Sequence, residues 1–343
     1  MRANYTVVQA MRGIAALWVV LFHASEGGHI EALYEGLPAA AARVLFDDGH
    51  LGVAIFFTLS GFVIAHSLSG TEMTARGWGS FMLRRSVRLD PAYWVSIGIV
   101  IAFGALSAKV LGEHFQLPSF GNLAAHVAYL QVMLGTPEIS SVYWTLTYEI
   151  QFYAFFAAAI IWRHHMWALV PIAFLSAVGT FTDIFPGFFV DLWASFFIGV
   201  LAKRATDDHR WLSALAVIGA PLAWSGSFGL INLATAVILW ISVRLGSAET
   251  MMNWRWLQFL GTISYSLYLL HNPISGATGF LGRKLVGSGV WADVAVLIMI
   301  VAASIIAAFC LWLAVERPTQ RFAKTLSAMN DRRAARSAEV SLR

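Results

Sequence analysis

The sequence predicts an all-α, polytopic membrane protein of about ten transmembrane helices with both termini in the cytoplasm. Composition is the first reason: 58% of the 343 residues are hydrophobic, only 12% are charged, and the mean hydropathy is +0.68. A soluble domain carries roughly 25% charged residues, so this chain lacks the charge that a water-facing surface needs. Soluble enzymes, disordered proteins and nucleic-acid-binding proteins are therefore excluded.

The length of the apolar stretches is the second reason. A bilayer core is about 30 Å thick, so a spanning helix needs roughly 20 apolar residues. Ten stretches approach this length, the sixth and seventh being the shortest: Val7–Ser25, Leu51–Leu68, Pro91–Leu111, Tyr143–Trp162, Trp167–Thr182, Phe188–Ala202, Trp211–Ser225, Gly229–Leu245, Phe259–Leu281 and Trp291–Val315. Asn122–Leu134 is amphipathic and too short to span, so we expect it along the interface.

The distribution of charge is the third reason, because it supports an even number of spans. With ten spans and a cytoplasmic N-terminus, most of the 23 basic residues lie on the inner side, and those on or near the outside are Arg43, Lys109, Arg283 and Lys284. This bias sets orientation in a bacterial inner membrane. We interpret residues 1–322 as one membrane domain and residues 323–343 as a basic, disordered cytoplasmic tail. The net charge of +4 then reflects inner loops, not a nucleic-acid partner.

Cysteine and histidine spacing excludes two kinds of site. Cys310 is the only cysteine, so the chain cannot form an internal disulfide, and no cysteine metal site is possible. The ten histidines do not show the spacing of a zinc site, so no metal is predicted.

Ionisable residues inside the spans are functional candidates, because a charge at membrane depth costs from about 2.5 kcal/mol upward. Glu149 is the only acid well inside a span, Arg12 the only basic residue, and His23, His66 and His271 are the histidines. At about 1.5 Å per residue, His23 lies about 24 Å and Glu149 about 21 Å from the inner face. We therefore predict that they can pair, so that the carboxylate orients the imidazole and raises its basicity. The alternative is a structural hydrogen bond.

Two other patterns each allow two interpretations. Arg85 and Arg88 are three residues apart at the inner face, which suits phosphate binding, or they are ordinary cytoplasmic charge. Ser60 and Gly61 lie in the middle of a span, where small residues allow close helix packing or a local kink.

Six elements, in this order, resemble those of the acyltransferase-3 family of bacterial integral membrane acyltransferases. They cover essentially the whole chain: Arg12 and His23 separated by ten residues, Phe56-Phe57-Thr58-Leu59-Ser60-Gly61-Phe62, Arg85 and Arg88 before Pro91-Ala92-Tyr93-Trp94, Trp144-Thr145-Leu146-Thr147-Tyr148-Glu149 with Phe152-Tyr153, Ser264-Tyr265-Ser266-Leu267-Tyr268 with His271, and Glu316-Arg317-Pro318. The opening resembles the exopolysaccharide-acetylating branch. Ala54 departs from the pattern, since relatives often have an acid there.

The resemblance implies an O-acyltransferase of the bacterial inner membrane. It would move an acyl group, expected to be acetyl, from cytoplasmic acyl-CoA to a hydroxyl of an extracytoplasmic glycan, such as an exopolysaccharide or O-antigen, or of a lipid-linked sugar. Acyl-CoA is a co-substrate, and no bound cofactor is expected. Acceptor sugar, hydroxyl position and the choice between acetyl and succinyl stay open.

The expected roles combine this resemblance with the depths above. Arg12, Arg85 and Arg88 would bind acyl-CoA, and His23, oriented by Glu149, would act as general base. An acyl-His23 intermediate is a rival to that base. Three residues would line the cavity: Ser60, Tyr268 and His271. Ser60 would pack against a neighbouring helix, donate a hydrogen bond or carry an acyl group.

Two functions of other classes are alternatives. In a secondary transporter, the intramembrane histidine and glutamate would relay protons, although the matched halves typical of transporters are not found in the sequence. A structural subunit of a polysaccharide assembly complex is the other alternative. Incubation with labelled acyl-CoA and a glycan separates all three.

Overall fold

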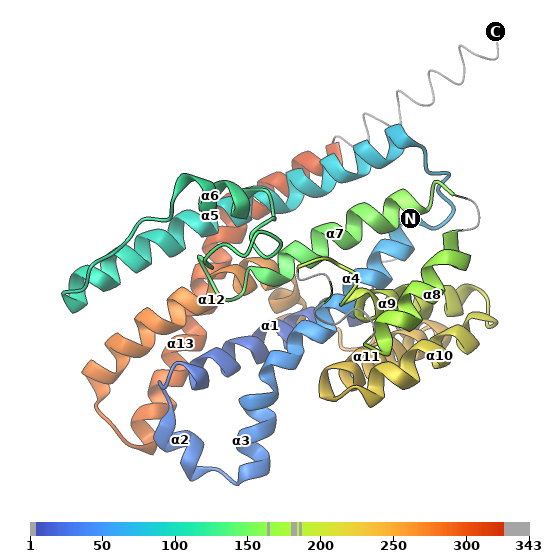
Figure 1. Ribbon diagram of the computed structural model, residues 1–343. Helices are drawn as coiled ribbons and strands as arrows, with labels where there is room; N and C mark the ends of the chain where they lie inside the picture. The colour runs from blue at the N-terminus through green and yellow to red at the C-terminus, as the bar shows by residue number, and fades with distance from the viewer. Residues whose placement is uncertain (1–4, 163–164, 180–183, 185–186, 326–343) are drawn as a thin grey trace.

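The computed structural model describes residues 5–162, 165–179, 184 and 187–325, and within these residues every regular element is helical (Figure 1). The main helices are α1 (Thr6–Glu26), α4 (Gly52–Leu68), α5 (Ala75–Leu111), α7 (Trp144–Ala159), α8 (His165–Ala177), α9 (Trp193–Asp207), α10 (Trp211–Trp224), α11 (Ser227–Arg244), α12 (Arg255–Val286) and α13 (Val290–Leu311). Shorter elements are α2 (Glu31–Gly36), α3 (Ala39–Leu45), η1 (Asp47–Leu51), α6 (Phe120–Val127) and η2 (Trp312–Glu316).

Each of the ten apolar ranges contains a helix, which confirms the all-α prediction. Within the described residues, five helical stretches are long and apolar enough to cross a membrane: Thr6–Glu26, Ala39–Leu68, Ala75–Leu111, Ser227–Arg244 and Val290–Thr325. Shorter apolar helices, such as α8 and α10, accompany them. This pattern is that of a multi-pass membrane protein. The number of ten spans and their direction stay predictions.

Helix α5 begins sixteen residues before the range that hydropathy predicts. Thr74 accepts a hydrogen bond from the Gly77 amide at 3.1 Å and so caps the start, while Gly112 ends the helix with a left-handed φ of 73°. Pro91, predicted to open the span, lies inside the helix. The arginines that precede Pro91 are therefore held on a rigid helix and not in a loop.

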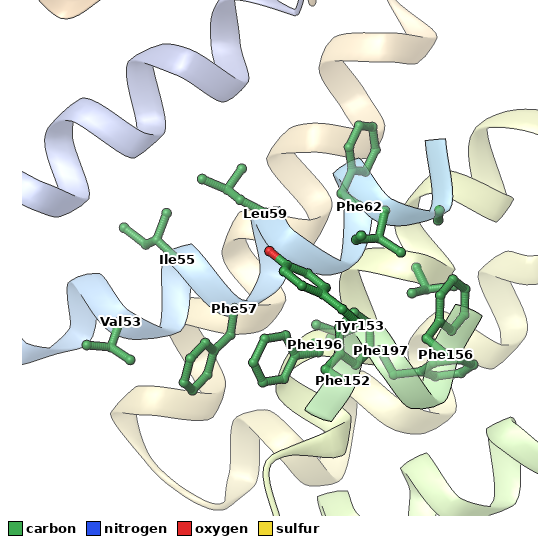
Figure 2. Packing of buried hydrophobic residues seen from close by; sticks show 14 of the residues in the cluster. Val53, Ile55, Phe57, Leu59, Phe62, Phe152, Tyr153, Phe156, Phe196 and Phe197 are labelled. Carbon is green, nitrogen blue, oxygen red and sulfur yellow. The ribbon is translucent and has the colours of Figure 1, made fainter. Parts of the chain in front are cut away.

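Close contacts between helices fix the position of α4 against α9. A Cβ atom on Gly61 would lie 1.8 Å from the Phe196 carbonyl oxygen, and one on Gly199 would lie 2.0 Å from that of Thr58. Only glycine permits this approach. Aromatic rings fill the space toward α7, where Figure 2 shows Phe57, Phe152 and Phe196 together; the ring of Phe196 lies 4.2 Å from that of Phe57 and 4.6 Å from that of Phe152.

Helix α1 packs in the same way against α12. A Cβ atom on Gly261 would lie 2.1 Å from the Gln9 carbonyl oxygen, and one on Gly13 would lie 2.9 Å from the Gly261 nitrogen. The two helices run in the same direction, because α1 and α12 also meet one end further on, at His23 and His271. This contact sets the depth of every polar residue on α1 relative to α12.

Several shorter segments lie outside the main bundle. Helices α2 and α3 lie together beyond the C-terminal end of α1 (Figure 1), and the Leu33 amide of α2 donates to Asp293 of α13 at 3.1 Å. The stretch predicted to lie along the interface, Asn122–Leu134, overlaps α6 from Asn122 to Val127; in this helix Phe120 is 88% exposed and His126 is buried. Ala323 continues the last helix, contrary to the predicted tail boundary, and the rest of the tail lies outside the described residues.

Candidate active site

A cavity with an empty volume of about 850 Å³ lies among α1, α4, α5, α7 and α12. Most of the site residues predicted from the sequence line it, together with apolar side chains. The lining residues are Arg12, Val53, Phe56, Phe57, Leu59, Ser60, Val63, Ile64, Arg85, Arg88, Leu89, Thr145, Leu146, Glu149, Tyr153, Ser264, Tyr265 and Tyr268. Residues that are distant in the sequence thus line one cavity, His23 and His271 not among them. The functional roles given to these residues stay predictions.

Three arginines form one end of this cavity. Arg12 Nε donates to Ser264 Oγ at 3.1 Å, and the Arg85 guanidinium lies 5.0 Å from the centre of the Tyr153 ring. Arg88 Nε is buried and has no hydrogen-bond partner among the described residues. In that part of the chain none of the three forms an ion pair with an acid. Clustered guanidinium groups without paired carboxylates are suited to binding an anion.

Glu149 is held beside these arginines by two hydroxyl groups. Ser60 Oγ donates to Glu149 Oε1 at 2.6 Å, and the Tyr153 hydroxyl donates to the same oxygen. The carboxylate therefore positions Ser60, which the sequence did not indicate. Tyr153 lies one helical turn after Glu149, so its place on the same face follows from helical spacing.

His23 does not pair with Glu149, and this part of the prediction is wrong. His23 Nδ1 lies 2.7 Å from Glu26 Oε2, three residues further along α1. The Glu26 side chain is 59% exposed, so the pair opens to the α2–α3 side of the bundle. Donation from Nδ1 to the carboxylate leaves the Nε2 lone pair available to accept a proton. The catalytic roles of His23 and Glu149 stay predictions.

The packing of α1 against the antiparallel α4 explains the error in depth. A Cβ atom on Gly52 would lie 2.6 Å from the Ala15 carbonyl oxygen, so these residues are level. His23 lies eight residues beyond Ala15 in one direction and Ser60 eight residues beyond Gly52 in the other, which separates them by about 24 Å along the helix axes at about 1.5 Å per residue. Glu149, bonded to Ser60, shares its depth.

The depth of Glu149 was misjudged because the start of α7 was assumed to lie at the membrane surface. The depth estimate placed Tyr143 at the outer face, but Tyr143 is only 1% exposed and its hydroxyl lies 2.8 Å from Ser96 Oγ. Because the segment that precedes it covers this end of the helix, α7 begins well inside the protein. Glu149 is correspondingly deeper than hydropathy predicts.

Tyr268 closes the cavity at the end opposite the arginines. Its hydroxyl lies 2.9 Å from Thr145 Oγ1 and donates to the Val142 carbonyl oxygen at 3.0 Å. Its ring centre lies 5.7 Å from that of Phe56 on one side and 5.8 Å from that of His271 on the other. The side chain therefore separates the cavity from the histidines.

His271 lies behind Tyr268 and does not line the cavity, contrary to the prediction. Its Nδ1 atom donates to the carbonyl oxygens of Tyr268 and Leu267 at 2.8 and 3.2 Å, and its buried Nε2 has no partner among the described residues. The ring centre of His271 lies 5.0 Å from that of His23. Tyr268, His271 and His23 thus form a continuous series of rings that leads from the cavity to the Glu26 side.

Two acids in this region were not among the predicted site residues. Glu26 was assigned to an outer loop, although its i, i+3 spacing from His23 would have indicated a shared helix face. Glu316 was placed just beyond the last span, yet it is only 3% exposed, and it accepts hydrogen bonds from Ser266 and Gln320 at 2.6 and 2.8 Å. It lies in the π-helical turn η2, a distortion found often at functional sites.

Comparison with known proteins gives an independent result. The family model described as an acyltransferase domain, acyltransferase 3, matches residues 6–313. BcsY of Komagataeibacter xylinus, whose name describes a membrane-bound transacylase, is 27% identical over 86% of this chain and 79% of its own length. The exopolysaccharide production protein ExoZ of Rhizobium meliloti is 30% identical over 34% of this chain and 35% of its own length.

Other relatives align over less of their length. Nodulation protein 10 of Rhizobium leguminosarum bv. viciae is 26% identical over 52% of this chain and 47% of its own length. The regulator of hypoxia-inducible factor 1 of Caenorhabditis elegans is 29% identical over 43% of this chain, and the chain covers about a third of that protein, 32%. No solved structure matches the chain significantly.

Proposed function

Because this chain belongs to the acyltransferase 3 family, we propose that it is an O-acyltransferase that moves an acyl group from cytoplasmic acyl-CoA to a hydroxyl of an extracytoplasmic glycan. The proposal includes ten spans, both termini in the cytoplasm, a bacterial inner membrane and acetyl as the group transferred. The excess of basic residues on the inner side supports this direction. The name of the exopolysaccharide relative supports a glycan acceptor.

A single observation carries the proposal. The cavity begins at arginines without paired acids and ends at Tyr268, and His271 and His23 continue from there to the opposite face. An anionic donor and a neutral hydroxyl acceptor that approach from opposite sides need this arrangement. A transporter instead needs one site that both sides can reach in turn.

The donor would enter at the arginine end. Charge-assisted hydrogen bonds from Arg12, Arg85 and Arg88 would hold its phosphates, and its flexible arm would extend along the apolar wall toward Tyr268. The thioester would then lie near the end of the cavity, one helical turn from His271. The apolar lining excludes water, which protects the thioester from hydrolysis.

The acceptor would meet His23 from the side of α2 and α3. Glu26 holds Nδ1, so Nε2 takes the proton of the acceptor hydroxyl while the hydroxyl oxygen attacks the thioester carbonyl carbon. For the two to meet, the Tyr268 side chain would swing aside and the thioester would move past it to His23. The carbon–sulfur bond breaks, the acyl group becomes an ester of the sugar, and the CoA thiolate leaves and is protonated. In this mechanism Glu26 takes the orienting role that the sequence had suggested for Glu149.

Glu149 would act on the donor side. It accepts the Ser60 hydroxyl at 2.6 Å, so it either fixes the cavity wall or activates Ser60 to carry the acyl group between donor and acceptor. An acyl-enzyme, on Ser60 or on His23, gives ping-pong kinetics and a labelled protein after incubation with donor alone. Direct transfer gives neither.

Purified protein in sealed lipid vesicles, incubated with radiolabelled acetyl-CoA and a bacterial exopolysaccharide, tests the function. The expected result is label in the glycan, released by mild alkali because the bond is an ester. Transport of label without covalent attachment would support the transporter alternative. Absence of both transfer and transport would contradict the proposal and leave a structural subunit.

A further inference from the structure

A second pocket opens at the end of the bundle where α4, α7 and α9 finish. Its empty volume is about 1260 Å³. The loop after α4 supplies Ser69 and Thr71, α9 supplies Arg204 and Asp207, and His165 starts α8. None of these residues has a place in the transfer step described above.

The second pocket continues the first along the same two helices. On α4, Ile64 lines the cavity and the adjacent Ala65 lines the second pocket. On α7, Tyr153 lines the cavity, and Phe156, three residues on and thus on the same face, lines the second pocket. The two pockets therefore lie next to each other along α4 and α7, with the buried side chains of Ile64 and Phe156 between them.

Arg204 presents a positive charge that is oriented within this pocket. His165 Nδ1 donates to the Trp162 carbonyl oxygen at 2.9 Å, which leaves Nε2 as an acceptor, and Arg204 Nη2 lies 3.4 Å from that atom. Among the described residues, Arg204 forms no ion pair with a carboxylate. The remaining N–H groups of its guanidinium are available to an anionic ligand.

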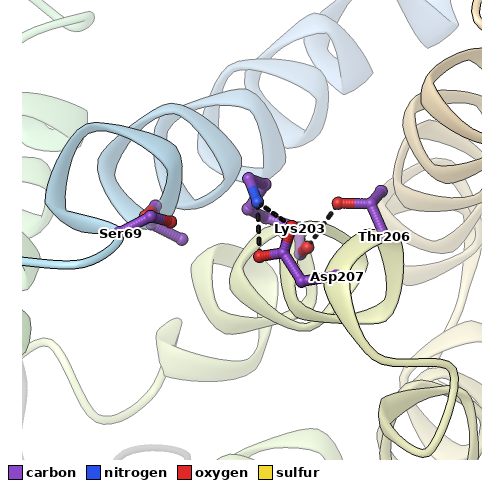
Figure 3. Close-up of polar contacts among 5 residues, drawn as sticks. Ser69, Lys203, Thr206 and Asp207 are labelled. Atoms are coloured by element: carbon purple, nitrogen blue, oxygen red, sulfur yellow. Dashed lines mark hydrogen bonds and ion pairs between the residues drawn. The ribbon is translucent and has the colours of Figure 1, made fainter.

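The neighbouring lysine is already neutralised. Figure 3 shows Lys203 beside Asp207 near Ser69, and Lys203 Nζ lies 2.7 and 2.5 Å from the two carboxylate oxygens of Asp207. The Lys203 side chain is only 7% exposed. This pairing removes the repulsion that Asp207 would exert on an anion, so that Glu72, in the exposed loop, is the acid left facing the pocket.

We propose that this second pocket binds the nucleotide end of the acyl-CoA donor. Arg204 forms charge-assisted hydrogen bonds with its 3′-phosphate, while the diphosphate and the arm that bears the thioester pass between α4 and α7 to the arginines of the cavity. The inference rests on the proposed function for the identity of the donor. It adds a binding site for adenosine phosphates that is separate from the arginines of the cavity.

Two donors separate this pocket from the cavity. Acetyl-CoA carries the nucleotide and acetyl-pantetheine lacks it, so the Arg204→Ala variant should raise KM for acetyl-CoA about tenfold and leave KM for acetyl-pantetheine unchanged. Arg210→Ala removes an exposed arginine at the same end of the bundle and is the matched control. An equal effect on both donors, or no effect on either, would overturn the inference.

Binding without turnover distinguishes a failure here from a failure of the proposed function. Adenosine 3′,5′-bisphosphate should bind the wild-type protein in calorimetry, and the Arg204→Ala variant should bind it about tenfold more weakly. If this nucleotide binds but no glycan is acylated, the pocket stands and the function fails. A different result would refute the nucleotide site: the wild-type protein acylates the glycan, has the same KM for acetyl-CoA and acetyl-pantetheine, and does not bind the nucleotide. This outcome does not depend on whether the variant folds.

Discussion

At one end of the cavity, Arg12, Arg85 and Arg88 lie together without paired acids, whereas beyond the other end His23 is held by Glu26 at 2.7 Å. Both groups are ionisable side chains on helices that hydropathy places in a membrane. The three arginines form no ion pair among the described residues and outnumber the two nearby acids, Glu149 in the same cavity and Glu316, which interacts with the charges of Arg12 and Arg88. The excess positive charge costs stability unless an anion compensates it. The histidine has a fixed hydrogen-bond donor and one lone pair left. The difference suggests a division between binding and proton transfer.

The substitution His23→Ala should cause the largest loss of activity, and it tests the proposed role of His23 in proton transfer. A positioned general base contributes about 10²–10⁴-fold to rate, so we expect kcat to fall by about 10³-fold while acetyl-CoA affinity is unchanged. Glycan acetylation and calorimetry measure the two quantities. His50→Ala, at an exposed histidine of η1, is the control. Full activity of His23→Ala would end the assignment.

The double substitution Arg85→Ala and Arg88→Ala should instead weaken donor binding and leave the proton-transfer step at His23 intact. Loss of two charge-assisted contacts should weaken acetyl-CoA binding by about 100-fold. Arg84→Ala is a matched control, because Arg84 bonds to Ser80 on its own helix and does not line the cavity. Unchanged affinity in the double variant would show that these arginines do not bind the donor.

The substitution Glu26→Gln tests whether the charge of Glu26 supports His23 without affecting donor binding. The amide keeps the size of the side chain but loses the charge that orients and stabilises protonated His23, so kcat should fall by about tenfold with KM for acetyl-CoA unchanged. Steady-state kinetics separate the two parameters. Glu31→Gln, at another acid on the same side, should have no effect. An increase in donor KM for Glu26→Gln would contradict the separation of the two ends.

The substitution Tyr268→Ala should have the smallest effect. It tests whether the Tyr268 side chain separates the cavity from His271 and His23. Removal of the ring should admit water to the thioester, so hydrolysis of acetyl-CoA without acceptor should rise about fivefold. Tyr268→Phe keeps the ring and loses only the hydroxyl contacts, so its hydrolysis rate should stay near that of the wild type. Release of free CoA measures the rate. No rise in Tyr268→Ala would show that Tyr268 does not seal the cavity.

Hydropathy and motif spacing predicted the helices and most of the cavity, because a membrane strongly restricts which segments can span it. One cavity is lined by residues from four of the motifs: Arg12, Ser60, Glu149 and Tyr268. The sequence did not show which of these helices are neighbours. The depth of each side chain could not be predicted either, since it depends on how far each helix is shifted along its neighbour.

The partner of His23 shows this limit at a single residue. Glu149 was favoured because it appeared to share the depth of the histidine, and Glu26 was passed over because it follows the apolar stretch. The glycine contacts at Gly52 and Gly261, which set the registers of α4 and α12 against α1, reverse that choice. Such contacts depend on backbone shape, which composition does not encode.

The closure formed by Tyr268 against Phe56 and His271 has a consequence for the cell as well as for chemistry. An energised membrane stores about 2.3 kcal/mol per elementary charge for each 100 mV, and any continuous aqueous channel would dissipate that store. In the proposed function, the Tyr268 ring would block ions on this route while an acyl group passes from one compartment to the other. An enzyme of that kind would modify material outside the cell without dissipating the membrane potential.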